Sequence, residues 1–326
     1  MKYRPRHAEE KLRKLAHHFK VVLVTGARQV GKTTLLKHVF PNHRHITFDP
    51  VQDLLGARRD PDFFLDSFPA PLILDEIQFA PELLAALKRR VDQSEKPGQY
   101  FLTGSQNLSV LRTVSESLAG RVALLPLEGM THLEMTGRAD KGQWLSRYLH
   151  DPEKFVKKLT PSESPRKSVP QMLWRGSFPG TLELPDEMIP EFFHAYLRTY
   201  VERDVRNVEG IRELTSFGRF VSLASALTAQ EVNASHLGRE VGISPNTGRK
   251  WLDLLAATYQ WFEIPPYHGN TIKRISGKAK GFFSDTGFAS SLHQISSPKA
   301  LAMNPMLGSL FETWVVSYIR RLFTQL

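Results

Sequence analysis

The amino-acid sequence predicts an α/β domain built on a parallel sheet, followed by a mainly helical domain. In the first third of the chain, short apolar runs alternate with amphipathic stretches, which is the pattern of repeated βα units. A polar segment punctuated by glycine and proline then interrupts this pattern. After about residue 186, helical periodicity dominates. The predicted division is a first domain at residues 1–135, a connector at 136–170 and a second domain at 171–326.

Five apolar runs in the first domain predict the strands of the sheet. Each run is short and bounded by glycine, proline or polar residues, which is typical of strands buried on both faces of a parallel sheet. The expected strands are Val21–Thr25, Arg44–Phe48, Leu72–Leu74, Tyr100–Thr103 and Val122–Leu125. Helices are expected between them at Thr33–Val39, Pro61–Leu65 and Pro81–Gln93.

The composition excludes several classes of protein. The chain has 326 residues, of which 41% are hydrophobic and 23% charged, as in ordinary globular proteins. No apolar run approaches the roughly 20 residues of a membrane helix, and the basic N-terminus lacks the apolar stretch of a secretory signal. The sequence contains no cysteine, which excludes disulfides, zinc knuckles and thiol nucleophiles. We therefore expect a cytoplasmic protein without a membrane partner.

The net charge of +10 suggests a polyanionic partner, but its distribution narrows that suggestion. Residues 1–50 hold 11 basic and 3 acidic residues, whereas residues 251–326 hold 7 basic and 4 acidic ones. The middle of the chain is nearly balanced. Most of the surplus thus surrounds the first candidate site described below, and only a small part lies in the second domain.

A phosphate-binding loop is the most specific feature of the sequence. The run from Gly26 to Thr33 matches the pattern G-x4-G-K-[ST], and it follows an apolar strand and precedes a helix. Glycine lets such a loop point its N–H groups at phosphate oxygens, Lys32 reaches the β- and γ-phosphates, and the Thr33 hydroxyl ligates Mg²⁺. The expected nucleotide-binding residues are Gly26, Ala27, Arg28, Gln29, Val30, Gly31, Lys32, Thr33 and Thr34.

Two acidic residues end the third expected strand. We expect Asp75 to hold the metal through water, as the corresponding aspartate of P-loop NTPases does. Glu76 would orient or deprotonate the attacking water. This pair indicates water as the acceptor of the phosphoryl group, and therefore an NTPase and not a kinase.

Two further residues are candidates for the catalytic site. Ser105, or Thr103 as a second choice, lies at the polar end of the fourth strand, where a side chain could sense the γ-phosphate. Capping of a helix by Ser105 is the structural alternative. Arg121 lies just before the fifth strand and could act as an arginine finger in its own chain or on a neighbouring subunit, or simply lie on a solvated edge.

The order of these motifs resembles the AAA-like division of P-loop ATPases, which has an additional strand and a catalytic glutamate. More closely, the chain is similar to a poorly characterised group of prokaryotic AAA-family ATPases, in which the ATPase core is followed by a domain of unknown function. The resemblance rests on Val24–Thr34, Leu74–Gln78, Leu102–Ser105 and Leu118–Val122, and on the later phrases Arg175–Pro179, Tyr196–Asp204 and Phe283–Gly287.

One departure from this group concerns the end of the chain. Its members usually continue past Phe311–Val316 into a region similar to restriction-type nucleases. The sequence stops at Leu326 within an expected helix, so we expect either a truncated chain or the loss of that region. No nuclease role is predicted from the residues present.

The second domain contains the pattern of a winged helix at about residues 228–288. Two expected helices, Ala234–Val241 and Asn246–Thr258, are separated by a turn at Gly242, and Trp261–Pro265 with Thr271–Ile275 could form the wing. If this module binds DNA, the contacts would come from Asn246, Thr247, Arg249, Lys250, Lys273, Arg274, Lys278 and Lys280. The alternative is a module used for packing or subunit contact.

The sequence as a whole predicts an enzyme that binds ATP and Mg²⁺, hydrolyses ATP and couples its nucleotide state to the second domain. Lys32, Ser105, Glu76 and Arg121 are the candidate catalytic residues, and Thr33 with Asp75 the metal site. Candidate partners are DNA, another protein or a second copy of the chain. The alternative is a nucleotide-gated DNA- or protein-binding regulator with little or no turnover.

Overall fold

A computed structural model of the chain describes residues 3–104, 114, 118–139, 144–158, 168–200, 205, 214–270 and 277–324. The chain divides into two compact units, and each is described by itself. The N-terminal unit comprises residues 1–142 with 324–326, and the C-terminal unit comprises residues 143–323. Within the described parts of the chain, no helix has the length and apolar character needed to cross a membrane.

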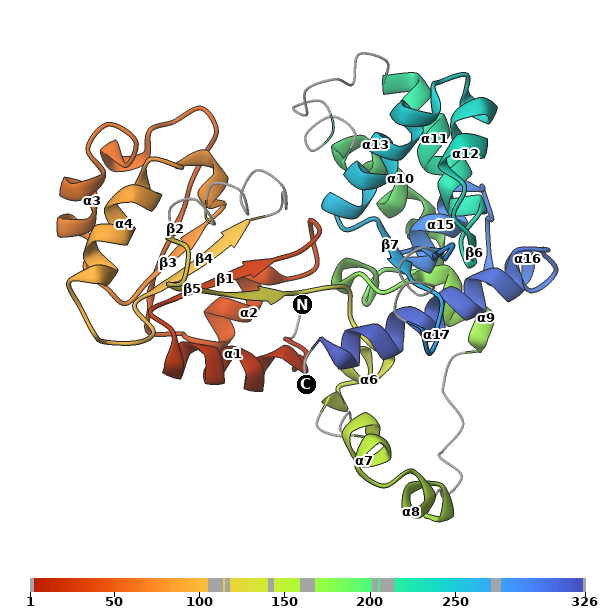
Figure 1. Cartoon of the computed structure of the whole chain (residues 1–326), viewed down its shortest axis with the longest axis horizontal. Helices are drawn as coiled ribbons and strands as arrows, with labels where there is room; N and C mark the ends of the chain where they lie inside the picture. The colour runs from red at the N-terminus through yellow and green to blue at the C-terminus, as the bar shows by residue number, and fades with distance from the viewer. Residues whose placement is uncertain are drawn as a thin grey trace. The chain divides into compact units, whose positions relative to one another are not determined.

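The N-terminal unit alternates strands and helices along the chain (Figure 1). Its strands are β1 (Val21–Thr25), β2 (Arg44–Thr47), β3 (Leu72–Asp75), β4 (Tyr100–Gly104) and β5 (Val122–Pro126). Its described α-helices are α1 (Ala8–His18), α2 (Lys32–Val39), α3 (Pro61–Ser67), α4 (Leu83–Asp92) and α6 (His132–Met135), and the 3-10 turns are η1 (Leu54–Gly56) and η2 (Ile77–Phe79). The expected parallel α/β domain is confirmed.

The five strands form one parallel sheet in the order β2-β3-β4-β1-β5. Because all strands run in the same direction, their carboxyl ends meet at one edge, where ligands bind in open α/β sheets. The register places Thr47 beside Asp75, and Leu74 beside Leu102, so the residues that follow at this edge are neighbours. The edge therefore brings together side chains that lie far apart in sequence.

Helices cover both faces of the sheet (Figure 1). One core cluster joins Leu23, Leu74 and Leu102 of the sheet to Phe64 of α3 and Leu87 of α4. Helices α1 and α2 lie on the other face (Figure 1). Strand β1 is buried along its whole length, as an apolar run between two layers requires. This packing fixes the strand ends that carry the candidate site.

The C-terminal unit is mainly helical. Its described α-helices are α7 (Trp144–His150), α8 (Pro152–Lys157), α9 (Val169–Arg175), α10 (Ile189–Thr199), α11 (Leu214–Ala226), α12 (Ala234–Val241), α13 (Pro245–Ala257), α15 (Thr286–Leu292), α16 (Pro298–Ala302) and α17 (Leu307–Phe323), with 3-10 turns η4 (Pro179–Thr181) and η5 (Asp186–Met188). The strands β6 (Gln230–Glu231), β7 (Trp261–Ile264) and β8 (Lys280–Phe283) form an antiparallel sheet in the order β6-β8-β7.

Helices α11, α12 and α13 pack around the buried Trp251. This indole makes edge-to-face contacts with Phe217 and Phe220 of α11, at ring-centroid distances of 5.3 Å for each. Ser244 caps α13 by accepting a hydrogen bond from the Thr247 N–H at 3.1 Å. The described strand partner of β7 is β8, whereas the wing strand expected at Thr271–Ile275 lies outside the described residues. The winged-helix assignment stays a prediction.

Two of the later phrases that carried the family resemblance meet at one buried carboxylate in the C-terminal unit. Asp285 accepts hydrogen bonds from the N–H and the hydroxyl of Ser177 and from the N–H of Phe288, the last capping α15. Gly176 lies so close that a Cβ there would meet Asp285 Oδ1 at 2.3 Å, and its φ is +68°. Glycine is therefore required at this position.

Candidate nucleotide site

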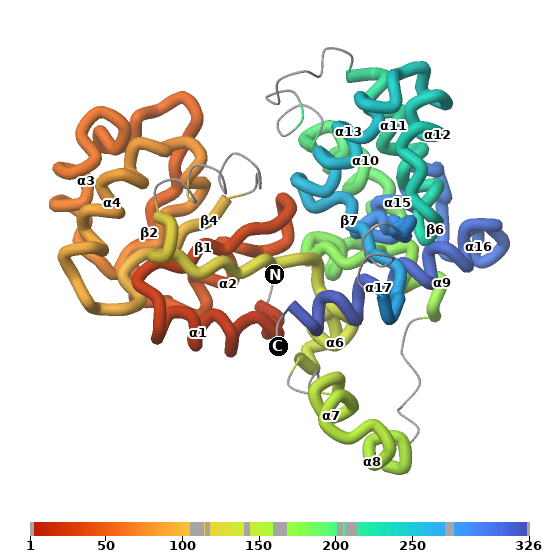
Figure 2. The backbone as a smooth tube through the Cα atoms, in the orientation of Figure 1, coloured from red at the N-terminus to blue at the C-terminus, as the bar shows by residue number. Residues whose placement is uncertain are grey.

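The phosphate loop leaves the carboxyl end of β1 and enters α2 (Figure 2). Its first glycine, Gly26, packs against the backbone that follows β5, because a Cβ at this position would meet Leu127 O at 2.0 Å. Gln29 has a φ of +61°, an uncommon conformation for a residue with a side chain. Such backbone strain is concentrated at ligand sites, and here the loop follows a buried strand at the edge where ligands bind.

Lys32 lies within this loop and is only 6% exposed. Its ammonium group donates hydrogen bonds to the carbonyl oxygens of Gly26 and Ala27, at 2.9 Å and 2.8 Å. These bonds curve the loop around the ammonium group. A positive charge is thus held beside the N–H groups that a phosphate would contact.

Asp75 ends β3 and is 5% exposed. The Thr33 hydroxyl donates to both of its carboxylate oxygens, at 2.8 Å and 3.0 Å, and the Thr47 hydroxyl donates to Oδ2 at 3.4 Å. His45 Nε2 lies 3.4 Å from the same oxygen without hydrogen-bond geometry. Burial and the charge of Lys37 hold the pKa of His45 below its ordinary value, so its ring is neutral at neutral pH.

Thr103, on β4, connects the two acidic residues. Its buried hydroxyl donates to Asp75 Oδ1 and accepts a hydrogen bond from the backbone N–H of Glu76 at 3.0 Å. The strand register produces this contact, because β3 and β4 are neighbours whose carboxyl ends coincide. One hydroxyl group thereby fixes both the Asp75 carboxylate and the backbone from which the Glu76 side chain leaves.

Glu76 follows Asp75 in a left-handed conformation, with a φ of +59°. The chain turns sharply here and continues into η2, so the Glu76 side chain leaves the strand direction at the carboxyl edge. Its carboxylate accepts a hydrogen bond from the Gln78 amide. A half-buried carboxylate on a strained turn is typical of a residue with a functional role.

The residues present suit a nucleotide with Mg²⁺. Hard cations such as Mg²⁺ prefer oxygen ligands, and Asp75 with Thr33 supplies a carboxylate and a hydroxyl in mutual contact. The loop supplies N–H groups at the start of a helix, together with the Lys32 ammonium. Ala27 and Val30 are buried, whereas Gln29 and Thr34 are exposed, so the loop residues contribute mainly through their backbone.

Arg121 lies at the opposite edge of the sheet. Val122 pairs with Val21 in the register, so Arg121 precedes the amino end of β5. The phosphate loop leaves the other end of β1, five residues and about 16 Å away at the usual rise of a strand. The guanidinium group donates to Asp92 and to the Ala119 carbonyl. Of the alternatives that the sequence left open, this position does not favour action on the site of the same chain, and a role on a neighbouring subunit stays a prediction.

Ser105 and the candidate DNA-binding residues are not among the residues that form the contacts described above for the nucleotide site. Ser105 lies outside the described residues, as do Lys273 and Arg274. Among the described candidate DNA contacts, Arg249 pairs with Asp253 and Glu263. Two others are also ion-paired, Lys278 with Glu231 and Lys280 with Glu312, while Asn246 and Lys250 are exposed on α13. Exposed pairs are weak and can exchange for phosphate, so DNA binding stays a prediction.

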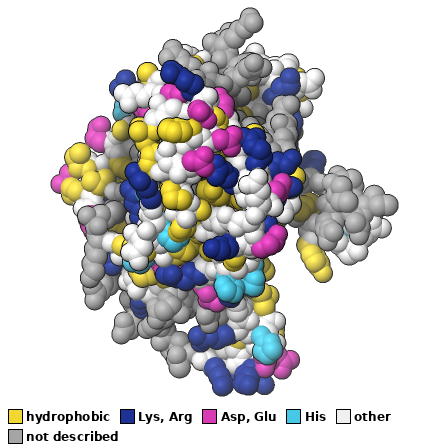
Figure 3. Space-filling view, turned by 90° about the vertical axis from the view of Figure 1, so that its left-hand side faces the viewer, with side chains coloured by type: hydrophobic (Ala, Val, Ile, Leu, Met, Phe, Trp, Pro, Cys, Tyr) yellow, Lys and Arg dark blue, Asp and Glu magenta, His cyan; other side chains and the backbone are white. Residues whose placement is uncertain are grey.

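Basic side chains do not form one continuous patch on the face that Figure 3 presents. Lys and Arg side chains there are scattered among acidic and apolar ones. The surplus of positive charge in residues 1–50 is in part buried at the phosphate loop, where Arg6 and Lys32 are 7% and 6% exposed. This supports the narrower interpretation of the net charge, as a feature of the nucleotide site.

Sequence reasoning missed three residues of this site. His45 and Thr47 reach Asp75 from β2, and the strand order that brings them there is not encoded in any local motif. Arg6 precedes α1 and donates to the carbonyl of Val30 in the phosphate loop at 2.8 Å. Its basic sequence context gave no indication that this one arginine is buried.

Comparison with known families agrees with this geometry. Residues 18–136 match the family model described as "AAA domain", and residues 166–299 match one described as "Domain of unknown function (DUF8612)". The first match contains the whole parallel sheet, and the second contains α9 to α15. The sequence and fold of the N-terminal unit are thus those of a P-loop AAA domain, and a domain of unknown function follows it in the chain.

The relatives and solved structures are less informative about activity. The chain is 29% identical over 319 residues to the uncharacterized proteins Rv2008c of Mycobacterium tuberculosis and Mb2031c of Mycobacterium bovis. The match covers 97% of this chain and 66% of each relative, so the chain spans just under two thirds of their length. The fold resembles that of the Walker-type ATPase PABY2304 of Pyrococcus abyssi, with a TM-score of 0.52, 16% identity, and coverage of 90% of this chain and 99% of that one.

Proposed function

We propose that this protein binds ATP and hydrolyses it by in-line attack of water on the γ-phosphate. One observation carries the proposal: the Thr103 hydroxyl joins the Asp75 carboxylate to the backbone of Glu76 at the edge that carries the phosphate loop. A carboxylate pair fixed in this way, next to Thr33, is the arrangement that a metal-assisted hydrolysis requires.

In this mechanism, the phosphate loop and Lys32 bind and neutralise the β- and γ-phosphates. Thr33 and Asp75 would hold Mg²⁺, which when bound withdraws charge from the phosphate oxygens. Because Asp75 is already positioned by Thr33 and Thr103, little reorganisation is needed when the nucleotide arrives.

Glu76 is the residue that distinguishes hydrolysis from binding alone. Its carboxylate would orient the attacking water and accept its proton. The left-handed turn at Glu76 and the hydrogen bond from Gln78 both restrict where this carboxylate points. Catalysis by a positioned carboxylate contributes typically about 10²- to 10⁴-fold in rate.

The partners of the enzyme belong to the same proposal. Hydrolysis would be coupled to the C-terminal domain, and through it to DNA or to another protein. Since Arg121 lies at the edge opposite the phosphate loop, a role as an arginine finger requires a second copy of the chain. The absence of cysteine supports a cytoplasmic location.

Steady-state ATP hydrolysis by the full chain with Mg²⁺ tests the proposal. We expect Glu76→Gln to bind ATP with a Kd within about threefold of the wild type and to lose at least about 100-fold in turnover. Lys32→Ala should abolish binding, because the loop loses its cation. Glu95→Gln, at an exposed position, and Lys88→Ala, on the exposed side of α4, are the matched controls and should behave as the wild type.

The same assay separates the enzyme from a nucleotide-gated regulator. A regulator would bind ATP tightly, turn it over no faster than Glu76→Gln, and change its affinity for a partner on binding. Repeating the assay with duplex DNA, with single strands and without nucleic acid tests the DNA prediction. An ATP turnover that DNA leaves unchanged, together with no salt-dependent DNA affinity, would exclude DNA as the partner.

A further inference from the structure

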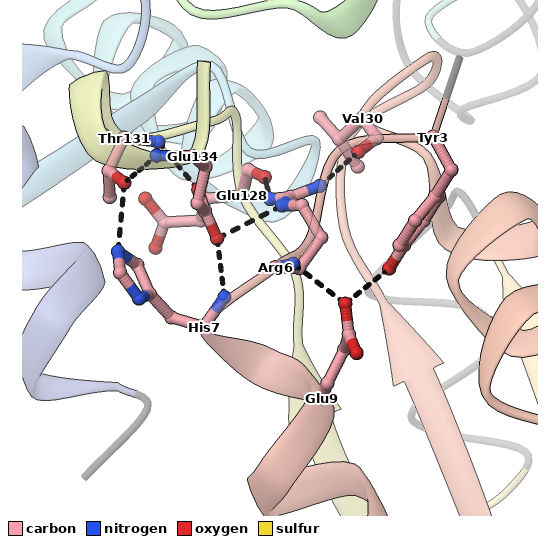
Figure 4. A network of polar contacts seen from close by, with 8 residues as sticks. All are labelled: Tyr3, Arg6, His7, Glu9, Val30, Glu128, Thr131 and Glu134. Atoms are coloured by element: carbon pink, nitrogen blue, oxygen red, sulfur yellow. Dashed lines mark hydrogen bonds and ion pairs between the residues drawn. The ribbon is translucent and has the colours of Figure 1, made fainter. Parts of the chain in front are cut away.

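A buried arginine outside the nucleotide motifs, Arg6, contacts the back of the phosphate loop. Its guanidinium group makes three hydrogen bonds: Nη1 donates to Val30 O at 2.8 Å, Nη2 to Glu128 O at 2.7 Å, and Nε to Glu134 Oε1 at 3.1 Å (Figure 4). The residue is 7% exposed. One planar group thus links the loop to two points in the segment that follows β5.

Glu134 is the fixed end of this link. Its carboxylate accepts hydrogen bonds from the N–H of His7 at 2.8 Å and from the N–H of Thr131 at 2.6 Å, the second closing a capping box on α6. Burial alone would raise the pKa of Glu134, but the charge of Arg6 and these N–H donors hold it below its usual range. The carboxylate is therefore ionised and immobile at neutral pH.

The contact with Val30 determines where a neighbouring N–H group points. The Val30 carbonyl and the Gly31 N–H belong to one planar trans peptide, so they point in opposite directions. Arg6 holds the carbonyl from behind the loop. The Gly31 N–H is thereby directed away from Arg6, toward the side on which the motif places the phosphates.

We propose that Arg6 is a positioning residue that holds the phosphate loop in its phosphate-binding shape through Val30, with Glu134 as its anchor. The inference rests on the proposed function for its consequence, which is ATP affinity. It is a statement about this chain's own loop, however, and the loop can be observed without nucleotide. A loop that is already shaped loses less conformational freedom when it binds a ligand.

A second arginine provides a matched control. Arg175, in the C-terminal unit, is 4% exposed and has the same set of partners: one carboxylate, from Asp186, and two backbone carbonyls, from Thr181 and Leu184. The two arginines differ in that only Arg6 contacts the phosphate loop. Their replacement should therefore cost stability in both cases and ATP affinity in only one.

The experiment measures the full-length protein with Arg6→Gln, Arg6→Lys and Arg175→Gln. For Arg6→Gln we expect faster hydrogen exchange of the amides at residues 26–33 without nucleotide, and a KM for ATP raised about tenfold with kcat within about threefold, as for the loss of a charge-assisted hydrogen bond. Arg6→Lys should recover little, because one ammonium cannot replace a planar fork with three acceptors. Arg175→Gln should lower the urea unfolding midpoint and leave both loop exchange and KM unchanged.

A further variant guards against loss of folding. Arg6→Gln combined with Glu134→Gln removes both charges, so no lone carboxylate stays buried. Wild-type loop exchange and wild-type KM in this double variant and in Arg6→Gln would overturn the proposal and leave Arg6 a purely structural residue. If the wild type itself binds no ATP, the proposed function fails, while loop exchange still decides the role of Arg6.

Discussion

The two units of the molecule each contain a buried aspartate beside a strand end, and the hydrogen-bond partners of the two residues differ in kind. Asp75, in the N-terminal unit, is 5% exposed, and Asp285, in the C-terminal unit, is 4% exposed. Each accepts hydrogen bonds from a serine or threonine hydroxyl. Residue type and burial therefore do not distinguish them.

The two aspartates differ in the groups that donate hydrogen bonds to their carboxylates. The hydrogen bonds described for the Asp75 carboxylate come from side-chain hydroxyls, of Thr33, Thr47 and Thr103. A hydroxyl can rotate and present its lone pairs to a cation, so these partners allow a metal ion to bind. Asp285 instead accepts two backbone N–H groups, from Ser177 and Phe288, and these cannot turn away. Its carboxylate is committed to joining two segments of the chain.

This difference explains why phrases that identify a family need not carry chemistry. Arg175–Pro179 and Phe283–Gly287 contribute to the family resemblance, yet in the structure they form a structural junction around Asp285. Backbone amides as partners indicate a structural carboxylate. Side-chain hydroxyls, which can rotate, are compatible with a bound metal ion at the carboxyl edge of a parallel sheet.

Replacement by asparagine should lower ATP turnover at Asp75 and the free energy of unfolding at Asp285. The loss of turnover is the largest effect that we expect. In Asp75→Asn, the amide oxygen can still accept from Thr33, but the charge that a metal ion needs is gone. We expect turnover to fall by about 10²-fold or more and the free energy of unfolding to change by about 1 kcal/mol or less. Steady-state hydrolysis and urea unfolding measure the two quantities. A stability loss as large as that of Asp285→Asn would contradict the distinction.

Asp285→Asn should show the converse. Donors approach both carboxylate oxygens, Oδ2 from Ser177 and Oδ1 from Phe288, so an amide nitrogen must face an N–H or O–H group on one side. We expect a loss of about 2–3 kcal/mol in the free energy of unfolding, because at least one buried donor is left without an acceptor. All five tryptophans lie in the C-terminal unit, so their fluorescence reports its unfolding. A changed ATP affinity would show that Asp285 also serves the nucleotide site.

The hydroxyl partners give a smaller pair of effects. Thr103→Val keeps the shape of the side chain but leaves the Glu76 N–H unsatisfied and Asp75 less restrained, so turnover should fall about tenfold. The counterpart, Ser177→Ala, removes one of the donors to Asp285 and should cost about 1 kcal/mol of stability with turnover unchanged. Equal turnover in the two variants would mean that Thr103 has no part in catalysis.

The sequence was sufficient to predict the parts of this architecture that are encoded in consecutive residues. The strands, the phosphate loop and the Asp75–Glu76 pair each occupy a short segment whose pattern has a physical meaning by itself. Thr103 was only the second choice at the end of its strand, because adjacency to Asp75 depends on the order of β3 and β4.

Contacts that depend on three-dimensional arrangement could not be predicted. Arg6 lies 122 residues from Glu128, and no periodicity relates the two positions. The position of Arg121 could have been predicted, since a residue that precedes a strand of a parallel sheet lies at the edge opposite the residues that follow the strands. The order of the strands, in contrast, emerges only from the packing of helices on both faces.

The smallest effect that we expect is a pH dependence of stability that arises in the C-terminal unit and leaves the nucleotide site unaffected. Burial holds the pKa of His293, in the C-terminal unit, below its ordinary value of 6.5, and its Nε2 lies 2.8 Å from the Ser225 hydroxyl. The unfolded chain then takes up this proton more readily than the folded one. The stability that His293 contributes is thus complete above about pH 6.5 and is lost as the pH falls through the folded pKa.

His293→Gln should therefore flatten the decline in the unfolding midpoint between pH 7.5 and 5.5, followed by tryptophan fluorescence. The change in slope should be smaller than the uptake of one full proton on unfolding would produce. The pH dependence of the KM for ATP should match that of the wild type, because His293 belongs to the unit without the phosphate loop. An unchanged slope in this variant would show that His293 has the same proton affinity in the folded and unfolded chains.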